Sequence, residues 1–340
     1  MYDIGVFEYS PSGCAYLLLA ELCVQNKNFD VDVLHQIIKL ASLQSGAIER
    51  TKSVYYKHLT GIGIPPYQTY TSFAELAKLV SIPCVVKMDA FRNGLQTQVI
   101  KSNKDLKSLY EILDKNDVTG VVQQFVTGQE LTVMVLVGAH NWQLVGTARD
   151  YKQELDNNQG RNTFGMGSVA PVALPAETLD LVDRIVDTFK EQYDYTGFLS
   201  CQFIVDANNK IWFLECNSRL CDPEFQSVVP SLDPSIYNGI KQALDGEIIE
   251  PIINSNLNAV TVALVHQDWP SANSKPSITI PDSDFVFCKF PGKKDANTYY
   301  GSLTNAGSKP HKELAQELYV FLSTIDTAPY RYRTDIGLDT

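Results

Sequence analysis

The sequence predicts a protein of mixed α/β and α+β class, with a reduced N-terminal unit, a central pair of lobes and a small C-terminal lobe. Three observations predict it. An apolar strand pattern, a Ser-Pro-Ser-Gly turn and an apolar helix open the chain, as in an α/β unit. From about residue 68, short strand patterns alternate with amphipathic helices, and near residue 256 a further set of strands with one helix begins.

The N-terminal unit is predicted from one strand and the helices that follow it. Residues 2–9 have the strand pattern, and residues 14–24 form the apolar helix after the turn. Residues 31–43 have an amphipathic helical period, and a helix at 49–65 ends in a Gly-Ile-Gly-Ile-Pro breaker. A full doubly wound sheet would need several more strands, so residues 1–50 are predicted to be a reduced α/β unit.

The central region, residues 51–255, is predicted to contain a small lobe at about 68–128 and a large lobe at about 129–255. In the large lobe, two long apolar strands lead into a polar loop from Tyr151 to Gly167, and a loop of that length is usually functional or mobile. Residues 256–340 are predicted to form a small separate α+β lobe. The predicted strands are 68–72, 83–90, 98–101, 120–126, 131–138, 142–150, 197–205, 210–217, 259–266 and 285–292, and the predicted helices are 73–80, 105–113, 177–193, 234–244 and 311–325.

The composition limits the classes of function. Hydrophobic residues make up 44% and charged residues 20%, and the apolar runs are shorter than the ~20 residues of a membrane span. The first residues lack the pattern of a signal peptide, and the seven cysteines are scattered without a CxxC pair, so a cytoplasmic protein with reduced, buried thiols is expected. A net charge of -11 argues against a nucleic-acid polymer or a membrane surface as partner, although phosphate ligands remain compatible with it.

Lys87 lies in the middle of the apolar strand 83–90. A buried lysine remains charged only if an anion meets it, so this residue indicates a contact with an anion. The alternative is a lysine on an edge strand whose amine reaches solvent.

A second motif surrounds Gln123 and Glu130. The strand 120–126 runs through a glycine turn into the strand that Glu130 begins, which leaves backbone groups free to bind an adenine edge. Glu130 can then accept two ribose hydroxyls, while Gln123, seven residues earlier, places an amide oxygen beside the purine amine.

A third motif follows the hairpin strand 210–217. Glu215 and Asn217 are spaced i and i+2, so both side chains face one side of the strand and offer hard oxygen ligands to magnesium. Arg219 adds a clamp for an anion, and Asp222 and Glu224 add further acceptors.

These motifs, in this order, resemble the ATP-grasp superfamily, in which two α+β lobes enclose ATP. The resemblance is closest to the phosphoribosylamine–glycine ligases and spans about residues 50–340. Four segments carry it: VVKMDA; RDYKQ followed by NTFGMGS; GFLSCQFIVDANNKIWFLECNSRLCDPEFQ; and YRTDIG. It implies activation of a carboxylate by ATP to an acyl phosphate, then attack by an amine to form an amide. Small molecules would be the partners: an amino acid, and an amine-bearing nucleotide or sugar phosphate.

The resemblance implies two sets of site residues. The nucleotide set has Lys87 and the lid residue Gly94 on the phosphates, Gln123 and the backbone near Val126 on the adenine, Glu130 on the ribose, and Glu215 and Asn217 on Mg²⁺ or Mn²⁺. The substrate set has Asp150, Lys152, Arg219, Asp222 and Glu224 as catalytic residues, with Asn162, Thr163, Gly165 and Gly167 in the loop around the acid and amine substrates.

The sequence departs from the family pattern in several places. The lid keeps Gly94 but has Leu95 and Gln96 where the family has lysine and glycine, so either Arg92 supplies the missing cation or the lid is inactive. The family's histidine in the RDYKQ segment is Tyr151, its paired hinge acids are Gln123 and Gln124, and one loop glycine is Phe164. The N-terminal turn could bind an anion through Ser10 and Ser12 or could be a plain capping turn.

Three functions are compatible with these residues. The first is an ATP-dependent carboxylate–amine ligase that uses glycine or another small amino acid. Its amine is open, because the N-terminal unit is reduced, and a modified nucleotide is an alternative acceptor. The second is a non-catalytic nucleotide-binding relative, and the third is an unrelated α/β binding protein. The oligomeric state is open.

Overall fold

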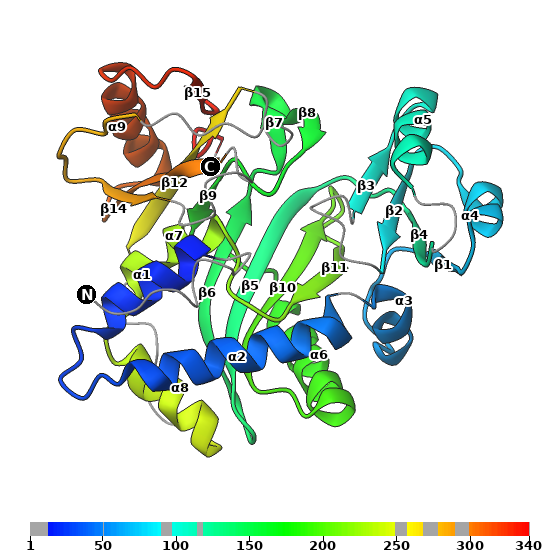
Figure 1. Ribbon diagram of the computed structural model, residues 1–340, viewed down its shortest axis with the longest axis horizontal. Coiled ribbons are helices and arrows are strands. Elements are labelled where there is room, and N and C mark those ends of the chain that lie inside the picture. The colour runs from blue at the N-terminus through cyan, green and yellow to red at the C-terminus, as the bar shows by residue number, and fades with distance from the viewer. Residues whose placement is uncertain are drawn as a thin grey trace.

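Two antiparallel β-sheets and the helices packed on them form the main body of the chain (Figure 1). The computed structural model describes residues 13–49, 51–89, 97–113, 118–248, 257–267, 278–289 and 299–339. One sheet has four strands in the order β1-β4-β2-β3; the other has nine, in the order β11-β10-β5-β6-β9-β12-β14-β13, with β15 paired to β12. No helix in the described ranges is long and apolar enough to cross a membrane.

The small lobe is the four-stranded sheet with two helices on it. Each helix begins with a serine cap. The hydroxyl oxygens of Ser72 and Ser102 accept the backbone N–H of the acidic residue three positions later, Glu75 or Asp105. The carboxylate of that acidic residue accepts the backbone N–H of the residue before the serine. Lys87 lies near the C-terminal end of strand β2, where it pairs with Val121 of β4. The elements are β1 Tyr67–Tyr70, α4 Phe73–Leu79, β2 Cys84–Met88, β3 Thr97–Ile100, α5 Asn103–Ile112 and β4 Gly120–Gln124.

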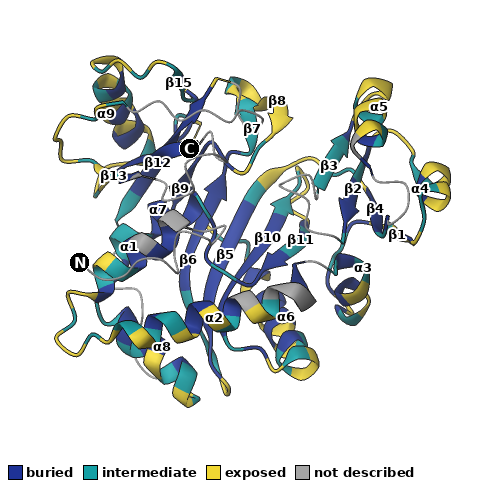
Figure 2. Ribbon diagram, in the orientation of Figure 1, coloured by how far each residue is buried: buried dark blue, intermediate teal, exposed yellow. Residues whose placement is uncertain are grey.

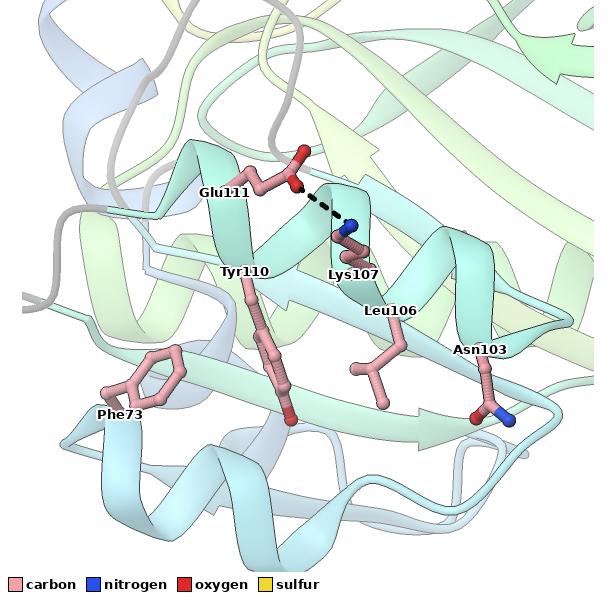
Figure 3. A pocket seen from close by; sticks show the side chains of 6 residues that line it. All are labelled: Phe73, Asn103, Leu106, Lys107, Tyr110 and Glu111. Carbon is pink, nitrogen blue, oxygen red and sulfur yellow. Dashed lines mark ion pairs between the residues drawn. The ribbon is translucent and has the colours of Figure 1, made fainter.

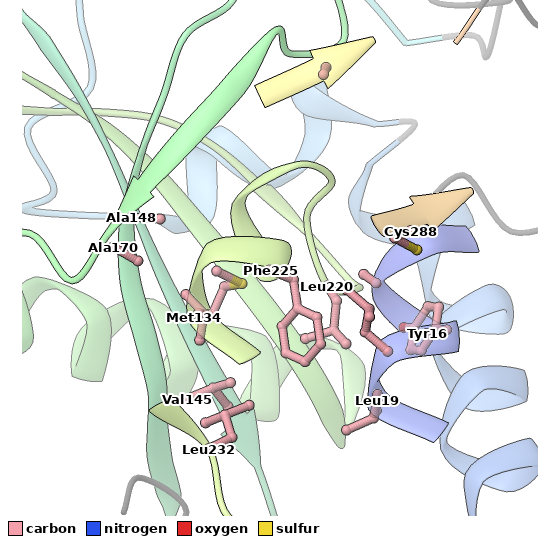
Figure 4. Packing of buried hydrophobic residues seen from close by; sticks show 14 of the residues in the cluster. Tyr16, Leu19, Met134, Val145, Ala148, Ala170, Leu220, Phe225, Leu232 and Cys288 are labelled. Atoms are coloured by element: carbon pink, nitrogen blue, oxygen red, sulfur yellow. The ribbon is translucent and has the colours of Figure 1, made fainter. Parts of the chain in front are cut away.

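The long strands of the large sheet are buried on both faces (Figure 2). Because side chains alternate along a strand, Val133 and Val135 of β5 face one core with helix α6, whereas Met134 and Leu136 face another core with α1, α2 and α8. Figure 4 shows the second core, where Phe225 of the short helix α7 packs beside residues of β5, β6 and α1. The elements are β5 Gln129–Val137, β6 Trp142–Asp150, β9 Gly167–Ala170, α6 Thr178–Tyr193, β10 Gly197–Val205, β11 Ile211–Asn217, α7 Glu224–Val228, η4 Val229–Ser231 and α8 Ile236–Asp245.

The C-terminal region extends the large sheet, so the prediction of a separate lobe is wrong. Strand β12 pairs with β9 from Ala259 to Val262, and β14 then pairs with β12. The reason is physical: the apolar strand β12 is buried along almost its whole length, and pairing with β9 satisfies its backbone groups. The elements are β12 Asn258–His266, β13 Val286–Lys289, β14 Tyr299–Gly307, α9 His311–Ser323 and β15 Tyr330–Arg331.

The N-terminal helices cover the large sheet beside α8 (Figure 1). The predicted helix at 49–65 is instead a short helix followed by a 3₁₀ turn, because the adjacent side chains of Tyr55 and Tyr56 are both buried and a longer surface helix would expose one of them. The predicted strand at 2–9 lies outside the described residues. The elements are α1 Gly13–Cys23, α2 Val31–Ile48, α3 Lys52–Tyr55 and η2 Tyr56–His58.

The predicted loop from Tyr151 to Gly167 is mostly a two-stranded ribbon. It consists of β7 Gln153–Leu155, the 3₁₀ turn η3 Asp156–Asn158 and β8 Gln159–Asn162. Asn157 and Asn158 adopt left-handed φ angles of 56° and 54°, which asparagine tolerates better than most residues and which close the turn. Because the residues of this segment are mostly polar, the sequence did not indicate that β7 and β8 pair.

The cysteines that the structure describes in full, at positions 23, 84, 201, 216, 221 and 288, are all buried free thiols. The sulfurs of Cys201 and Cys216 face each other across β10 and β11 at 3.4 Å. For these residues, the prediction of reduced, buried thiols is confirmed.

Candidate functional site

The predicted phosphate lysine lies at the junction of the two sheets. Lys87 is 3% exposed, and its Nζ donates to the carbonyl oxygen of Leu214 at 2.7 Å and to the hydroxyl of Tyr56 at 3.0 Å. Its direct partners are thus neutral oxygens. Burial lowers the pKa of Lys87 to about 7, although the charge of Glu215 acts in the opposite direction. Among the described residues, no carboxylate bonds directly to this amine, so it can accept an anionic ligand.

A second buried lysine, which sequence reasoning missed, binds the predicted metal ligand. Lys52 at the start of α3 is 3% exposed; its Nζ lies 3.3 Å from Oε2 of Glu215 and donates to the carbonyl oxygen of Glu49. Burial would raise the pKa of Glu215, but the charges of Lys52, Lys87 and Lys152 outweigh it and lower that pKa to about 2. Glu215 is therefore a carboxylate at any physiological pH.

Lys152 occupies the middle of a set of acceptors beyond the end of β6. Its Nζ lies 3.1 Å from Oε2 of Glu130, 3.8 Å from Oδ2 of Asp150 and 2.9 Å from Oε1 of Gln202. Burial opposes its charge, yet Glu130 and Asp150 raise its pKa above the usual range. Glu130, the predicted ribose acceptor, is thus paired with Lys152 in this structure.

The Asp-Pro-Glu segment adds buried carboxyl groups on the other side of Asp150. Asp222 accepts the backbone N–H of Ala15 at 3.0 Å and the Gln226 amide at 2.7 Å, both on Oδ1, and Glu224 accepts the hydroxyl of Thr132 at 3.0 Å. Burial raises the pKa of Asp222 to about 7 and also raises the pKa of Glu224. Oδ2 of Asp222 and Oδ1 of Asp150 are buried and have no hydrogen-bond partner among the described residues, so this cluster has free acceptor capacity.

Arg219 is engaged by protein groups rather than open to an anion. Its Nε lies 3.4 Å from Oε2 of Glu49, and its Nη2 donates to Oδ1 of Asn217 at 3.3 Å. Glu49 also accepts the backbone N–H and the hydroxyl of Ser218, so the N-terminal helices lock this turn in place. Arg219 therefore orients the predicted metal ligand Asn217 by hydrogen bonding.

The predicted substrate loop is anchored against the Asp-Pro-Glu segment. Thr163 donates its N–H at 2.7 Å and its hydroxyl at 2.8 Å to the carbonyl of Lys152. Gly165 has φ +119°, and a Cβ there would overlap the ring of Pro223 and come within 3.1 Å of Oδ1 of Asp150. The loop thus borders the unpartnered oxygen of Asp150.

Other predicted residues lie differently. Gly167 has φ +154° and packs against the backbone oxygen of Thr261, so it serves the junction of β9 and β12 rather than a ligand. Asn162 is exposed at the end of β8, where its Oδ1 accepts the amide of Gln153 at 3.2 Å.

The predicted adenine side lies at the end of the small lobe. The amide of Gln123 reaches the carbonyl of Pro65 at 3.5 Å and bonds to Tyr56, and Val126 is half-buried on the connection from β4 to β5. Gly94, Arg92 and the rest of the lid lie outside the described residues, as do Ser10 and Ser12. A shallow groove of about 400 Å³ on the outside of the small lobe is separate from all these groups; Figure 3 shows its lining by Phe73, Asn103, Leu106, Lys107, Tyr110 and Glu111.

Comparisons with known proteins show the family of this chain. The family model "Phosphoribosylglycinamide synthetase, ATP-grasp (A) domain" matches residues 51–225, more than half of the chain. The chain belongs to this family. The phosphoribosylamine–glycine ligase of Thermotoga maritima is 28% identical over 80% of this chain and 71% of its own length.

Solved structures place the chain in the ATP-grasp fold, as predicted. The crystal structure of a phosphoribosylamine–glycine ligase from Thermotoga maritima matches with a TM-score of 0.69 and 26% identity, over 84% of this chain and 78% of that one. N5-carboxyaminoimidazole synthetase from Staphylococcus aureus, solved with ADP, matches with a TM-score of 0.60 and 15% identity, over 82% and 72% of the two chains, which shows the fold alone.

Sequence reasoning missed several residues that contact the predicted site residues or hold them in place. Lys52 and Glu49 lie on the N-terminal helical segment, and Tyr56, Thr132 and Gln202 come from three further elements. The sequence offered one indication of Lys52, a lysine shortly before Val54 and Tyr55. The other contacts depend on which strands and helices pack together, and no local pattern encodes that.

Proposed function

We propose that this chain is an ATP-dependent ligase that joins the carboxylate of a small amino acid to an amine. Glycine is the proposed acid and phosphoribosylamine the proposed amine, after the name of the relatives. The reaction class follows from membership of the synthetase family; the two substrates are carried over from the relatives' name and are the finer part of the proposal.

One observation carries the proposal: two buried lysines, Lys52 and Lys87, and the half-buried Lys152 reach the surroundings of Glu215 from three separate parts of the chain. Lys52 comes from α3, Lys87 from β2 and Lys152 from the end of β6, and each lowers the pKa of Glu215. Burying an ammonium group is costly unless an anion compensates it. Glu215 lies against Lys52, and Glu130 and Asp150 lie against Lys152, but the described partners of Lys87 are neutral oxygens, so a polyphosphate is the ligand class that fits best.

The donor set also fits a magnesium nucleotide. Glu215 is ionised and Asn217 offers an amide oxygen; both are hard oxygen donors of the kind that Mg²⁺ prefers. Bound ATP would supply the phosphoryl group that activates the carboxylate of the amino acid. Lys52 and Lys87 would hold the phosphates and offset the negative charge that develops during transfer.

The buried acids are suited to the amine. An amine must lose a proton to become an amide nitrogen. Asp222 has a pKa of about 7, and its Oδ2, which has no hydrogen-bond partner in the described part of the chain, can accept one. Asp150 presents a second oxygen beside Gly165 that no described residue hydrogen-bonds. We assign the ammonium groups of both substrates to this cluster, with Lys152 keeping Asp150 and Glu130 in place.

The test is a product assay with purified protein, ATP, Mg²⁺, glycine and phosphoribosylamine, in which ADP is measured and the product is identified by mass. ADP should form only when both substrates are present, and the product mass should correspond to their amide. A panel of other amines and amino acids, run in parallel, tests the substrate assignment separately from the reaction class.

Glu215→Gln keeps the shape of the side chain and removes its charge, so it should abolish ADP formation in a folded protein. Glu191→Gln on the exposed face of α6 is the matched control and should leave the rate unchanged. If the wild-type protein binds ATP tightly but releases no ADP with any acid and amine, the ligase proposal is wrong and a non-catalytic nucleotide-binding role replaces it.

A further inference from the structure

The C-terminal segment Arg331–Asp339 is bound along the ribbon of β7 and β8. Arg333 is 1% exposed; its Nη1 donates to the carbonyl oxygen of Gln153 at 3.1 Å, and its Nη2 lies 2.7 Å from Oδ2 of Asp335. The backbone N–H of Thr334 donates to Asp156 at 2.9 Å. A segment distant in sequence thus holds the ribbon that precedes the substrate loop.

The hydroxyl of Tyr151 connects this segment to the end of β6. It accepts hydrogen bonds from Nη2 of Arg149 and from the N–H of Gly337 at 3.1 Å, and it donates to Oδ1 of Asp339 at 2.6 Å. A phenol oxygen has one hydrogen and two lone pairs, so these bonds use its full capacity. The centre of the buried ring also lies 4.6 Å from the guanidinium carbon of Arg149 and 5.2 Å from that of Arg333.

The backbone of Tyr151 and its neighbour holds both ends of the substrate loop. Tyr151 donates its N–H to the carbonyl of Gly167 at 3.0 Å and accepts the N–H of Met166 at 2.8 Å. Lys152 accepts the N–H of Thr163 at 2.7 Å. A shift of Tyr151 would therefore move residues 163–167 together with Lys152, the cation that neutralises the acids of the site.

We propose that Tyr151 is a positioning residue for the substrate side of the site, and that it fixes the loop at 163–167 by anchoring it to Asp339 and Gly337 of the C-terminal segment. The effect on catalysis rests on the proposed function, whereas the effect on the loop does not.

The tyrosine matters because of its single oxygen. A histidine at this position would not replace it, because a neutral imidazole has its one donor and one acceptor on different nitrogens. It cannot make the three bonds that Tyr151 makes at one atom. The anchoring through Asp339 and Gly337 is therefore matched to the tyrosine of this chain.

The test compares Tyr151→Phe and Asp339→Asn with the wild-type protein. The control is Glu317→Gln, which removes an exposed ion pair with Lys309 elsewhere in the C-terminal region. Hydrogen exchange of the amides at 163–167 should speed up about tenfold or more in both variants, because each variant loses the hydrogen bond between Tyr151 and Asp339 that holds the loop. The KM values for the amino acid and the amine should rise by about the same factor, while the KM for ATP stays within about twofold. Asp339→Glu, which keeps the carboxylate, should recover part of the loss.

The inference is overturned if both variants are folded and show wild-type exchange at 163–167 and wild-type KM for the amino acid. It is also overturned if the KM for ATP rises as much as the other two, or if the control variant behaves like the test variants. If the wild-type protein has no ligase activity, the proposed function fails, and the hydrogen-exchange comparison alone still decides whether Tyr151 positions the loop.

Discussion

Replacing Asp222 by asparagine should stabilise the protein at high pH while removing its activity. Burial raises the pKa of Asp222 from 3.8 to about 7, so between these values the folded protein holds a proton on this carboxyl that the unfolded chain does not. A raised pKa contributes stability at low pH that is lost as the pH rises toward 7. The amide of asparagine cannot ionise and keeps an oxygen for the N–H of Ala15, so the variant lacks this loss.

The size of this stability difference follows from the pH range over which the folded and unfolded states differ in protonation. At pH 5 the folded group is protonated and the unfolded one is ionised, and each pH unit is worth ~1.4 kcal/mol until the folded group ionises near pH 7. The wild type therefore loses ~2 kcal/mol relative to Asp222→Asn by pH 7 and ~3 kcal/mol by pH 8. Asp150 and Glu224 also have raised pKa values, but both proteins contain them. Their contributions to the pH dependence therefore cancel when the variant is compared with the wild type.

The assay is urea unfolding of both proteins at pH 5 and pH 8, followed by tryptophan fluorescence. The free energies of unfolding should diverge by ~3 kcal/mol between the two pH values, with the variant the more stable at pH 8. ADP formation, measured in parallel, should be lost in the variant. Equal pH dependence of stability in the two proteins would refute the reasoning, because it would mean that Asp222 ionises in the folded state as readily as in the unfolded one.

Three further predictions concern the phosphate side, the loop and the core. Lys52→Ala should raise the KM for ATP about tenfold or more through loss of a buried cation, whereas Lys57→Ala, on the exposed side of η2, should not; equal values for the two variants would contradict the assignment. Gly165→Ala should raise the KM for the amino acid while leaving that for ATP unchanged, because its Cβ would overlap a proline ring, and an unchanged amino-acid KM would exclude this packing. Phe189→Ala in α6 should lower the free energy of unfolding by ~3–5 kcal/mol, against ~0.5 kcal/mol or less for Leu179→Ala on the same helix, which is 40% exposed; a loss below ~1 kcal/mol would mean that Phe189 is not in a packed core.

Much of the fold was predictable because the local signals were strong. The strand with Lys87, the hairpin that ends at Asn217 and the helix at 178–193 were predicted to within a few residues, since their periodicity, caps and turn residues all agree. The ribbon β7–β8 was missed because its residues are polar, and the turn at Tyr55 and Tyr56 was missed because the core there overrides helical propensity.

The candidate site was predictable in part. The order and spacing of Lys87, Glu130 and Glu215 pointed to a nucleotide before any contact was known, because buried charge at strand ends needs a ligand. Two assignments changed once contacts were known. Arg219 is engaged by Glu49, and Gly167 packs against a neighbouring strand.

The sequence by itself determined the local elements, the order of the charged residues and the family pattern, because each of these depends on residues close together in the chain. Only the tertiary structure decided that β12 continues the large sheet through β9, that the N-terminal helix binds Asp222, and that Tyr151 binds the C-terminal segment. These contacts join residues far apart in the chain. Their partners are selected by burial and by the need to satisfy backbone and charged groups, and neither is visible in a local pattern.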